Sequence, residues 1–253
     1  MSKIIGIIPA RYASTRFPAK PLVDIAGKSM IQRVYEQCKK SKSLSEVVVA
    51  TDHELIFRAV EEFGGKAVMT AENHPSGTDR CYEAFQKSGG DFDYAINIQG
   101  DEPFIEPEQI DLLADLLQSN QTQIATLANK ITQSEELFDA NAVKVVRNGE
   151  DEGIYFSRSP IPFLRGVERE NWVNQQDYFR HLGIYAFRSD VLAQITRLPM
   201  GKLEQAESLE QLRWLENGYS IKVGITPHKS VGIDSPEDLE KVLKERFGIE
   251  GKM

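Results

Sequence analysis

The sequence predicts an α/β fold built on a mostly parallel, doubly wound sheet. Short apolar runs rich in β-branched residues alternate with amphipathic stretches of helical period through roughly the first hundred residues, which is the pattern of repeated strand–helix steps. The chain of 253 residues, 41% of them hydrophobic, can bury a sizeable core. We therefore expect residues 1–253 to form a single domain, with one excursion from the sheet around residues 148–180.

Charge and cysteine content narrow the classes of function. The net charge is −8 and no basic block interrupts the sequence, so we expect no nucleic-acid partner. No apolar run approaches the length of a membrane span and no signal segment opens the chain, so we expect no membrane partner. Cys38 and Cys81 are isolated and lack CxxC spacing, which favours a reducing, cytoplasmic compartment.

The first half predicts four strands and the helices between them. Residues 4–8 are apolar, too short for a helix and mostly isoleucine, which is typical of a strand buried on both faces. Ser29 is the expected N-cap of the first helix, and Thr51 or Asp52 that of the second. The expected elements are strands over residues 4–8, 46–50, 66–69 and 94–98 and helices over residues 29–40, 53–63 and 79–87.

The second half is less regular. The prolines within residues 157–162 exclude a central strand, so we interpret the surrounding stretch as an excursion toward a partner subunit. Ser235 followed by Pro236 and two acids is a strong start signal for the last helix. The expected elements are strands over residues 123–130, 142–146, 181–187 and 220–225 and helices over residues 107–119, 190–196, 204–217 and from 236 onward.

A cationic loop follows the first predicted strand. It contains Arg11, Ser14, Thr15, Arg16 and Lys20, and it lies beyond the carboxyl end of the strand, where open α/β sheets bind ligands. Such a density of cations and hydroxyls suits a triphosphate. Neither GxxxxGK[ST] nor GxGxxG is present, so a P-loop NTPase and a dinucleotide fold are not supported. The alternative is a solvated basic loop, which the position after the first strand disfavours.

Two aspartates are candidates for holding a metal ion. Asp101 follows a predicted buried strand behind Gln99 and Gly100, which would direct its carboxylate toward the ligand crevice, where it could hold Mg²⁺. Asp234 lies between the last strand and the last helix and could supply a second oxygen. The alternatives are a turn-forming aspartate at position 101 and an extended helix cap at position 234, and the spacing in the sequence does not bring the two together.

Polar residues in the last third have both structural and functional interpretations. His181 and Tyr185 lie four apart on a predicted strand, which places both side chains on one face. Each is by default a structural residue with its polar atom satisfied. On the predicted helix over residues 204–217, the default position of Glu207 is in solvent. Cys38 and Cys81 are interpreted as small hydrophobes.

Sequence blocks along nearly the whole chain are similar to a known family. They resemble the 3-deoxy-manno-octulosonate (Kdo) cytidylyltransferases, or CMP-Kdo synthetases. The blocks are IIPARYASTRFPAKPL at 7–22, VATDHE at 49–54, HPSGTDR at 74–80, NIQGDEP at 97–103, NAVKVV at 141–146, YFSRSPIP at 155–162, RHLGIYAF at 180–187, ESLEQLRWLENG at 207–218 and GIDSPEDLEKV at 232–242. The blocks at 180–187 and 207–218 are specific to this family rather than shared by all sugar nucleotidyltransferases.

The resemblance implies a Rossmann-like nucleotidyltransferase fold, a homodimer and a reaction. CTP and Kdo, an acidic eight-carbon sugar, would give CMP-Kdo and pyrophosphate for lipopolysaccharide biosynthesis, with Mg²⁺ as cofactor. Lys20, Asp101 and Asp234 would be catalytic, with both aspartates holding the metal. The residues implied for CTP are Arg11, Ser14 and Lys20, and those implied for the sugar are Arg80, Gln99, Arg158, His181, Tyr185, Glu210 and Gln211.

The implied site leaves some alternatives open. Arg80 and Arg158 are candidates for a fork on the sugar carboxylate, since a guanidinium binds a carboxylate through two parallel hydrogen bonds. No general base is assigned. The chain departs from the family at Ala19, where glycine is usual before the lysine, which affects how closely the backbone can approach a phosphate. Rival functions are a cytidylyltransferase for 8-amino Kdo, sialic acid or methylerythritol phosphate, and a non-catalytic nucleotide-binding protein.

Overall fold

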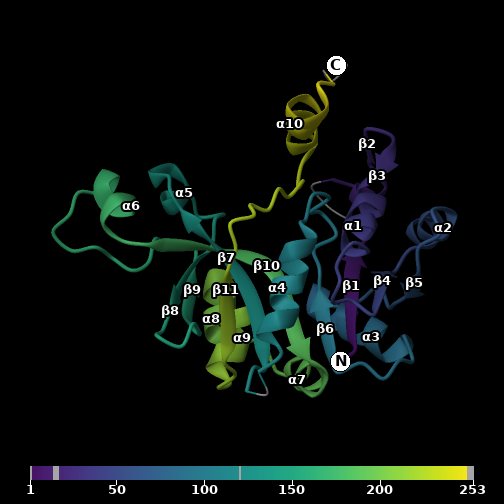
Figure 1. Ribbon diagram of the computed structural model, residues 1–253, viewed down its shortest axis with the longest axis horizontal. Coiled ribbons are helices and arrows are strands. Elements are labelled where there is room, and N and C mark those ends of the chain that lie inside the picture. The colour runs from purple at the N-terminus through teal and green to yellow at the C-terminus, as the bar shows by residue number, and fades with distance from the viewer. Residues whose placement is uncertain (1, 14–16, 120, 250–253) are drawn as a thin grey trace. The chain divides into compact units, whose positions relative to one another are not determined.

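A computed structural model describes residues 2–13, 17–119 and 121–249 (Figure 1). The chain divides into two compact units. Unit 1 is Met1–Asp111 with Ser230–Met253, and unit 2 is Leu112–Lys229. The compactness of each unit does not test whether they fold as one, so the single domain over residues 1–253 stays a prediction. In the described part, no helix is long and apolar enough to cross a membrane.

Unit 1 contains a parallel sheet with the strand order β6-β1-β4-β5. Three of the four isoleucines of β1 are fully buried, because parallel strands are covered on both faces. The elements of unit 1 are β1 (Ile4–Ala10), η1 (Lys20–Leu22), β2 (Asp24–Ile25), β3 (Lys28–Ser29), α1 (Met30–Cys38), β4 (Glu46–Thr51), α2 (Glu54–Glu62), β5 (Ala67–Met69), α3 (Gly77–Lys87), β6 (Tyr94–Asn97) and α10 (Pro236–Phe247), and α4 (Pro107–Leu116) begins in it.

The strand order reverses beside β1. The chain steps outward from β1 to β4 and β5, and then returns to place β6 on the other side of β1. Because parallel crossovers are right-handed, α1 and α2 cover one face of this sheet and α3 the other. The predicted doubly wound arrangement is therefore present in unit 1. Its carboxyl edge between β1 and β6 is a topological switch point, the place where such sheets bind ligands.

Of the three helix N-caps predicted in unit 1, two agree with the structure and one differs. Ser29 Oγ accepts a hydrogen bond from the Gln32 N–H (3.3 Å), as predicted, and Ser235 caps α10 in a capping box with Asp238. The predicted cap of α2 at Thr51 or Asp52 is wrong. Because β4 stays extended through Thr51, the cap is His53, whose Nδ1 accepts from the Leu55 N–H (3.2 Å).

A two-stranded hairpin of β2 and β3 was not anticipated. Its turn places Ala26 at φ 49° and Gly27 at φ 85°, and two consecutive positive φ values are typical of a tight hairpin turn. Each strand has only two residues, which is too short to show the alternation that identifies a strand in a sequence.

Unit 2 contains a mixed sheet with the order β11-β7-β10-β8-β9. β7 is parallel to β11, whereas β10 is antiparallel to β7 and β8, and β8 is antiparallel to β9. The α/β class is confirmed, and antiparallel pairing is an addition to the mostly parallel expectation. The elements are β7 (Ile124–Ile131), α5 (Ser134–Phe138), β8 (Lys144–Arg147), β9 (Gly153–Ser157), η2 (Arg169–Asn171), α6 (Trp172–Gln175), β10 (Tyr178–Arg188), α7 (Ser189–Ile195), α8 (Lys202–Glu207), α9 (Gln211–Glu216) and β11 (Ile221–Ile225).

The single helix predicted over residues 204–217 is two helices. Ser208, at the end of α8, has φ 52° in the left-handed region, and α9 starts three residues later. The side chain of Arg158 donates to the carbonyl oxygens of Glu207 (2.7 Å) and Ser208 (3.3 Å). A distant arginine thereby satisfies carbonyls that a continuous helix would bond to its own next turn. The apolar spacing in the sequence is helical on both sides of the break and does not reveal it.

The excursion is a packed segment that starts with an unpredicted strand, β9. Beyond β9, Trp172 of α6 is buried in a satellite cluster with Leu137 and Tyr178, and its Nε1 donates to the Val167 carbonyl (3.0 Å). Phe163 stacks edge-on against Trp172 and is 72% exposed. Residues 148–180 thus contain regular structure, and the role of the excursion in dimerisation stays a prediction.

Candidate active site

The loop that follows β6 is in contact with the last residues of β1 at the carboxyl edge of the unit 1 sheet. A Cβ on Gly100 would lie 2.6 Å from the carbonyl oxygen of Pro9, so only glycine allows the two backbones to approach this closely. Gln99 and Asp101 flank this glycine immediately after β6. The contact brings the residues after β6 against the start of the cationic loop.

Lys20 joins the two aspartates that the sequence alone could not bring together. Its Nζ lies 2.7 Å from Asp101 Oδ2 and 3.0 Å from Asp234 Oδ1, although 81 and 214 residues separate the partners in the sequence. The backbone N–H of Ile233 also donates to the Asp101 carbonyl (3.0 Å), which aligns the two acidic segments. Catalytic roles for these three residues stay a prediction, and the geometry shows them as one cluster.

The electrostatics of this cluster keep Lys20 charged. Burial lowers the pKa of Lys20, but the charges and hydrogen bonds of Asp101 and Asp234 outweigh it, so the pKa lies above its ordinary value of 10.5. The ammonium therefore remains a cation throughout the neutral range.

The two carboxylates fit a magnesium ion that also binds phosphate. Both carboxylates contact the Lys20 ammonium, which shows that both can face a single positive centre. Among the described residues no group of three or more His, Cys, Asp or Glu is arranged to hold a metal. Mg²⁺ commonly uses one or two carboxylates and takes its other ligands from water and substrate phosphates. The donor set therefore suits Mg²⁺ bound together with a nucleotide.

Arg11 is tied to the segment before α3. Its Nη2 donates to the carbonyl oxygens of His74 (2.6 Å) and Ser76 (3.3 Å). Glu83 holds the same segment from α3, since it accepts from the Ala71 N–H (2.9 Å) and contacts the His74 ring. Arg11 thus joins the cationic loop to the HPSGTDR block. Ser14, with Thr15 and Arg16, lies outside the described residues.

Arg80 is buried in a polar network rather than open to solvent. Its side chain is fully buried, with Nη2 2.6 Å from Asp52 Oδ2 and Nη1 2.6 Å from Thr70 Oγ1. Burial lowers the pKa of Arg80 despite the opposing charge of Asp52. Within the described part, its Nε is buried without a hydrogen-bond partner. A role in binding the sugar carboxylate stays a prediction.

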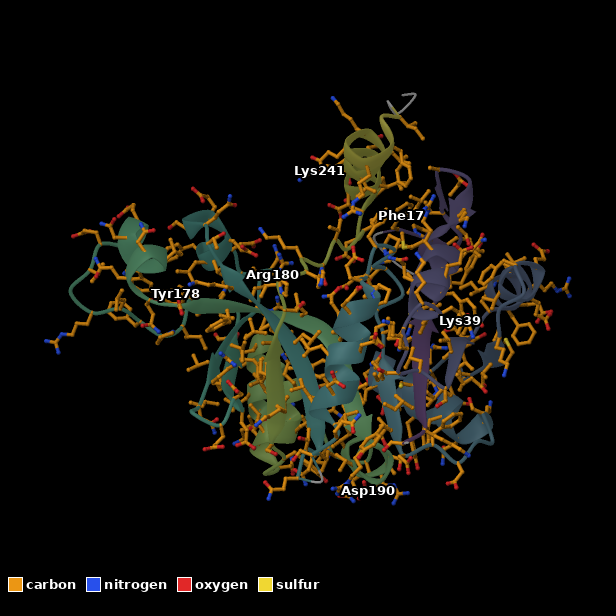
Figure 2. All side chains as sticks on the ribbon, in the orientation of Figure 1. Phe17, Lys39, Tyr178, Arg180, Asp190 and Lys241 are labelled. Atoms are coloured by element: carbon orange, nitrogen blue, oxygen red, sulfur yellow. The ribbon has the colours of Figure 1, made fainter. Side chains whose placement is uncertain are left out.

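His181 and Tyr185 lie against each other on β10 of unit 2, as their spacing predicted. Their ring centroids are 5.3 Å apart, although a bulge between Leu182 and Tyr185 shifts the register against β7 (Figure 2 labels the start of β10 at Tyr178 and Arg180). Burial, with the charge of Arg180, lowers the pKa of His181 to about 3. The ring is therefore neutral at physiological pH.

Thr126 determines which nitrogen of His181 carries the proton. The Thr126 hydroxyl lies 2.8 Å from the Ile184 carbonyl and 3.1 Å from the Leu182 carbonyl, so it donates its one proton to a carbonyl of the bulge. Its oxygen then accepts from His181 Nε2, 3.0 Å away. Nδ1 is left as an acceptor, the atom that a sugar hydroxyl needs.

Four buried donors of unit 2 have no hydrogen-bond partner among the described residues, and three of them form one group: Tyr185 Oη, Gln211 Nε2 and Trp214 Nε1. The fourth, Arg147 Nε, belongs to a guanidinium that lies over the Phe179 ring. The rings of Tyr185 and Trp214 meet edge to face at 5.0 Å, and Gln211 and Trp214 lie three apart on α9, which places them on one helix face. Burying unpaired donors is costly, so this cluster is suited to a ligand rich in oxygen. Trp214 was not predicted, because an isolated tryptophan on an apolar helix face is typical of a core.

The remaining predicted sugar residues lie at the junction of α8 and α9. The Arg158 guanidinium donates to backbone carbonyls of residues 140, 207 and 208. Glu207, expected in solvent, instead accepts from the Ser157 hydroxyl (2.6 Å) and the Arg158 N–H (2.9 Å), because the junction folds back onto β9. Glu210 is the N-cap of α9. The pKa of Tyr185 lies well above its ordinary value of 10.0, mainly because the hydroxyl is buried and secondly because the negative charge of Glu210 is near.

Buried Lys144 supports this junction and was also missed by the sequence analysis. Its Nζ donates to the carbonyls of Asp139 (2.8 Å) and Arg158 (2.6 Å), and burial lowers its pKa. A lysine within an apolar strand pattern gives no signal of such a tertiary role.

Comparison with known proteins decides the family. A cytidylyltransferase family model matches residues 5–223. The 3-deoxy-manno-octulosonate cytidylyltransferase of Parabacteroides distasonis is 56% identical, covering 96% of this chain and 98% of that protein. The protein of the same name from Bacteroides thetaiotaomicron is 55% identical over 96% of this chain and 99% of that protein. The chain belongs to the 3-deoxy-manno-octulosonate cytidylyltransferase family. It is therefore a nucleotidyltransferase.

Solved structures agree with this membership. A structure of CMP:2-keto-3-deoxy-manno-octonic acid synthetase complexed with CTP is 44% identical, with a TM-score of 0.88 over 95% of this chain and 97% of that chain. A 4-diphosphocytidyl-2C-methyl-D-erythritol synthase from Anaerococcus prevotii is 12% identical, with a TM-score of 0.59 over 94% of this chain and 95% of that chain. The second likeness shows only the shared fold.

Proposed function

We propose that this enzyme transfers CMP from CTP to the 2-hydroxyl of Kdo, releasing pyrophosphate and giving CMP-Kdo for lipopolysaccharide biosynthesis. The observation that carries the proposal is the Lys20–Asp101–Asp234 cluster at the switch point of a chain belonging to this family. In the reaction the hydroxyl oxygen bonds to the α-phosphorus and the bond to the β-phosphate oxygen breaks. The hydroxyl proton passes to solvent, and no general base is assigned.

The nucleotide side is assigned to Arg11, Ser14 and Lys20. Phosphoryl-group transfer depends mainly on alignment and charge neutralisation, because the protein supplies little covalent chemistry. Lys20 remains protonated, so it supplies a fixed positive charge for triphosphate oxygens. When bound by Asp101 and Asp234, Mg²⁺ would neutralise phosphate charge. Arg11 acts by joining the cationic loop to residues 74–76.

The sugar side is assigned to Arg80, Gln99, Arg158, His181, Tyr185, Glu210 and Gln211. His181 Nδ1 is the acceptor for a sugar hydroxyl, and the buried donors Tyr185 Oη and Gln211 Nε2 suit sugar oxygens. A site built to hydrogen-bond hydroxyls rejects analogues that lack them, because its buried polar groups are then left unpaired. This lining supports an acceptor with many hydroxyls.

Pyrophosphate release tests the proposal directly. The purified enzyme is given CTP and Mg²⁺ with Kdo, 8-amino Kdo, sialic acid or methylerythritol phosphate, and Asp101→Asn serves as the inactive variant. We expect release with Kdo and a loss of roughly two or more orders of magnitude in Asp101→Asn. If pyrophosphate were released only with another of these acceptors, that compound would replace Kdo as the proposed substrate. CTP binding without release for any acceptor would favour a non-catalytic nucleotide-binding protein.

We also propose a cytoplasmic homodimer. The excursion of unit 2 carries two exposed apolar side chains, Phe163 (72%) and Ile154 (58%), which support an interface with a second copy. Cys38 and Cys81 are buried and form no disulfide in the described part of the chain, which supports a reducing compartment.

A further inference from the structure

Helix α10 shares an apolar cluster with residues close to Lys20, Asp101 and Asp234. A cluster of unit 1 contains Val242, Leu239 and Leu243 of α10 together with Phe17, Phe104 and Ile233 (Figure 2 labels Phe17 close to α10, the helix that carries Lys241). Phe17 lies three residues before Lys20, Phe104 three residues after Asp101, and Ile233 directly before Asp234. Each apolar anchor therefore sits next to one charged member of the site.

The end of α10 is held by a stack of rings and cations. Phe247 meets Phe104 with ring centroids 6.2 Å apart. The guanidinium of Arg33 lies 4.9 Å from the centroid of Phe247, and that of Arg246 lies 4.2 Å from the centroid of Phe104. Arg33 also donates from Nε to the Ile25 carbonyl (2.7 Å), which connects the stack to the β2–β3 hairpin. Cations over aromatic faces and tilted ring pairs each stabilise such contacts modestly.

We propose that this Arg33–Phe247–Phe104–Arg246 stack, here called the clasp, positions Asp101, Lys20 and Asp234 for Mg²⁺ and CTP. The three charged residues come from segments far apart in the sequence, and two like-charged carboxylates repel unless packing holds them together. Ile233 is fully buried in the cluster and its N–H donates to the Asp101 carbonyl, so the packing of α10 on Ile233 helps to hold the segments of Asp101 and Asp234 in register. The clasp residues are positioning residues. This inference rests on the proposed nucleotide site.

Phe247→Ala tests the clasp. Removing the ring deletes the contacts with Phe104 and Arg33, so we expect the Mg²⁺ concentration for half-maximal rate and the KM for CTP to rise about five- to tenfold. The KM for Kdo should stay within about twofold, since the sugar residues other than Arg80 and Gln99 lie in unit 2. Calorimetric titration with CTP and Mg²⁺ should show the same weakening without any turnover.

The controls separate positioning from loss of stability. Phe92→Ala removes a ring from the Phe85–Phe92 pair of unit 1 (6.4 Å), and it should leave the Mg²⁺ and CTP dependence unchanged. Phe247→Tyr keeps the aromatic ring, so its Mg²⁺ and CTP dependence should match that of the wild-type enzyme. If Phe247→Ala does not fold, Arg246→Met is the second test, since it removes only the cation over Phe104 from the solvent side of α10. We expect Arg246→Met to weaken Mg²⁺ and CTP binding by about two- to threefold.

Three results would overturn the inference. Unchanged Mg²⁺ and CTP dependence in both Phe247→Ala and Arg246→Met would show that the clasp does not position the site. A uniform fall in kcat with unchanged half-saturation values would show a purely structural role. Failure of the wild-type enzyme to bind CTP would overturn the proposed function together with the inference, whereas CTP binding without turnover would overturn only the proposed transfer.

Discussion

At the residue scale, the cationic loop contains a strained alanine. Ala19 has φ 56°, and its N–H donates to the Tyr12 carbonyl (3.1 Å) to close the loop. The left-handed region is costly for any residue with a Cβ. Glycine, the residue that the family resemblance leads us to expect here, would adopt this conformation just before Lys20 without strain. The departure therefore changes the stability of the loop while keeping its path.

Ala19→Gly is expected to raise the free energy of unfolding by about 0.5–1 kcal/mol. Relief of the left-handed strain exceeds the entropy that glycine adds to the unfolded chain. Urea unfolding followed by circular dichroism measures the difference. Ala13→Gly is the matched control in the same loop, where φ is not positive, and it should be neutral or destabilising. Stabilisation of equal size by both substitutions would show that Ala19 is not strained.

His181 should make stability depend on pH. Its pKa is about 3 in the folded protein and near 6.5 when unfolded, so the unfolded chain binds the extra proton between these values. Protonation of His181 therefore leaves the free energy of unfolding unchanged above pH 6.5 and lowers it progressively as the pH falls toward 3. His181→Gln should flatten the loss of stability between pH 7 and 5, measured by urea unfolding. An unchanged slope in the variant would place the ring in contact with solvent.

At the scale of elements, the junction of α8 and α9 depends on one arginine. Arg158 satisfies the carbonyls of residues 140, 207 and 208, and the carboxylate of Glu207 in turn holds Ser157 and the Arg158 N–H. The junction ends at α9, which carries Gln211 and Trp214 with their unpaired donors. Whatever orients α9 therefore also orients the donors proposed to bind the sugar.

Arg158→Ala should raise the KM for Kdo by at least about tenfold and leave the KM for CTP within about twofold. The substitution removes several hydrogen bonds at the junction and leaves carbonyls unpaired. Arg158→Lys should restore little, because an ammonium lacks the planar fork that reaches separate carbonyls. Steady-state kinetics with each substrate varied in turn provide the measurement. An equal rise for CTP would assign this arginine to the nucleotide instead.

At the scale of the whole molecule, the chain contains two compact units with different sheet pairing. Unit 1 holds the parallel sheet and the Lys20 cluster, and unit 2 holds the mixed sheet, the donor cluster and the excursion. The cores of both are built from short β-branched runs, which explains why the sequence predicted an α/β fold throughout. Phe163, the exposed aromatic of the excursion, marks the surface where assembly is testable.

Phe163→Glu is expected to convert a dimer into a monomer at micromolar concentration. A charge in an apolar interface loses its hydration without gaining a partner. Light scattering after size-exclusion chromatography measures the mass. Leu55→Glu is the control, since Leu55 is 51% exposed on α2 of unit 1, and it should leave the mass unchanged. A monomeric wild-type protein, or a dimeric Phe163→Glu, would contradict the proposed interface.

The sequence by itself determined the α/β class, most strands and helices, and the caps at Ser29 and Ser235. These features depend on apolar periodicity and on hydrogen bonds between residues that are neighbours in the chain. It also identified the family, through blocks spread along the whole chain.

Only the tertiary structure decided which distant groups meet. The Lys20 bridge between Asp101 and Asp234 and the break at Ser208 require partners tens to hundreds of residues away. The burial of Arg80 and the unpaired donors around Trp214 likewise depend on packing. Hydrogen bonds and burial are properties of three-dimensional proximity, so local pattern could name the candidate residues but could not show which of them are already engaged.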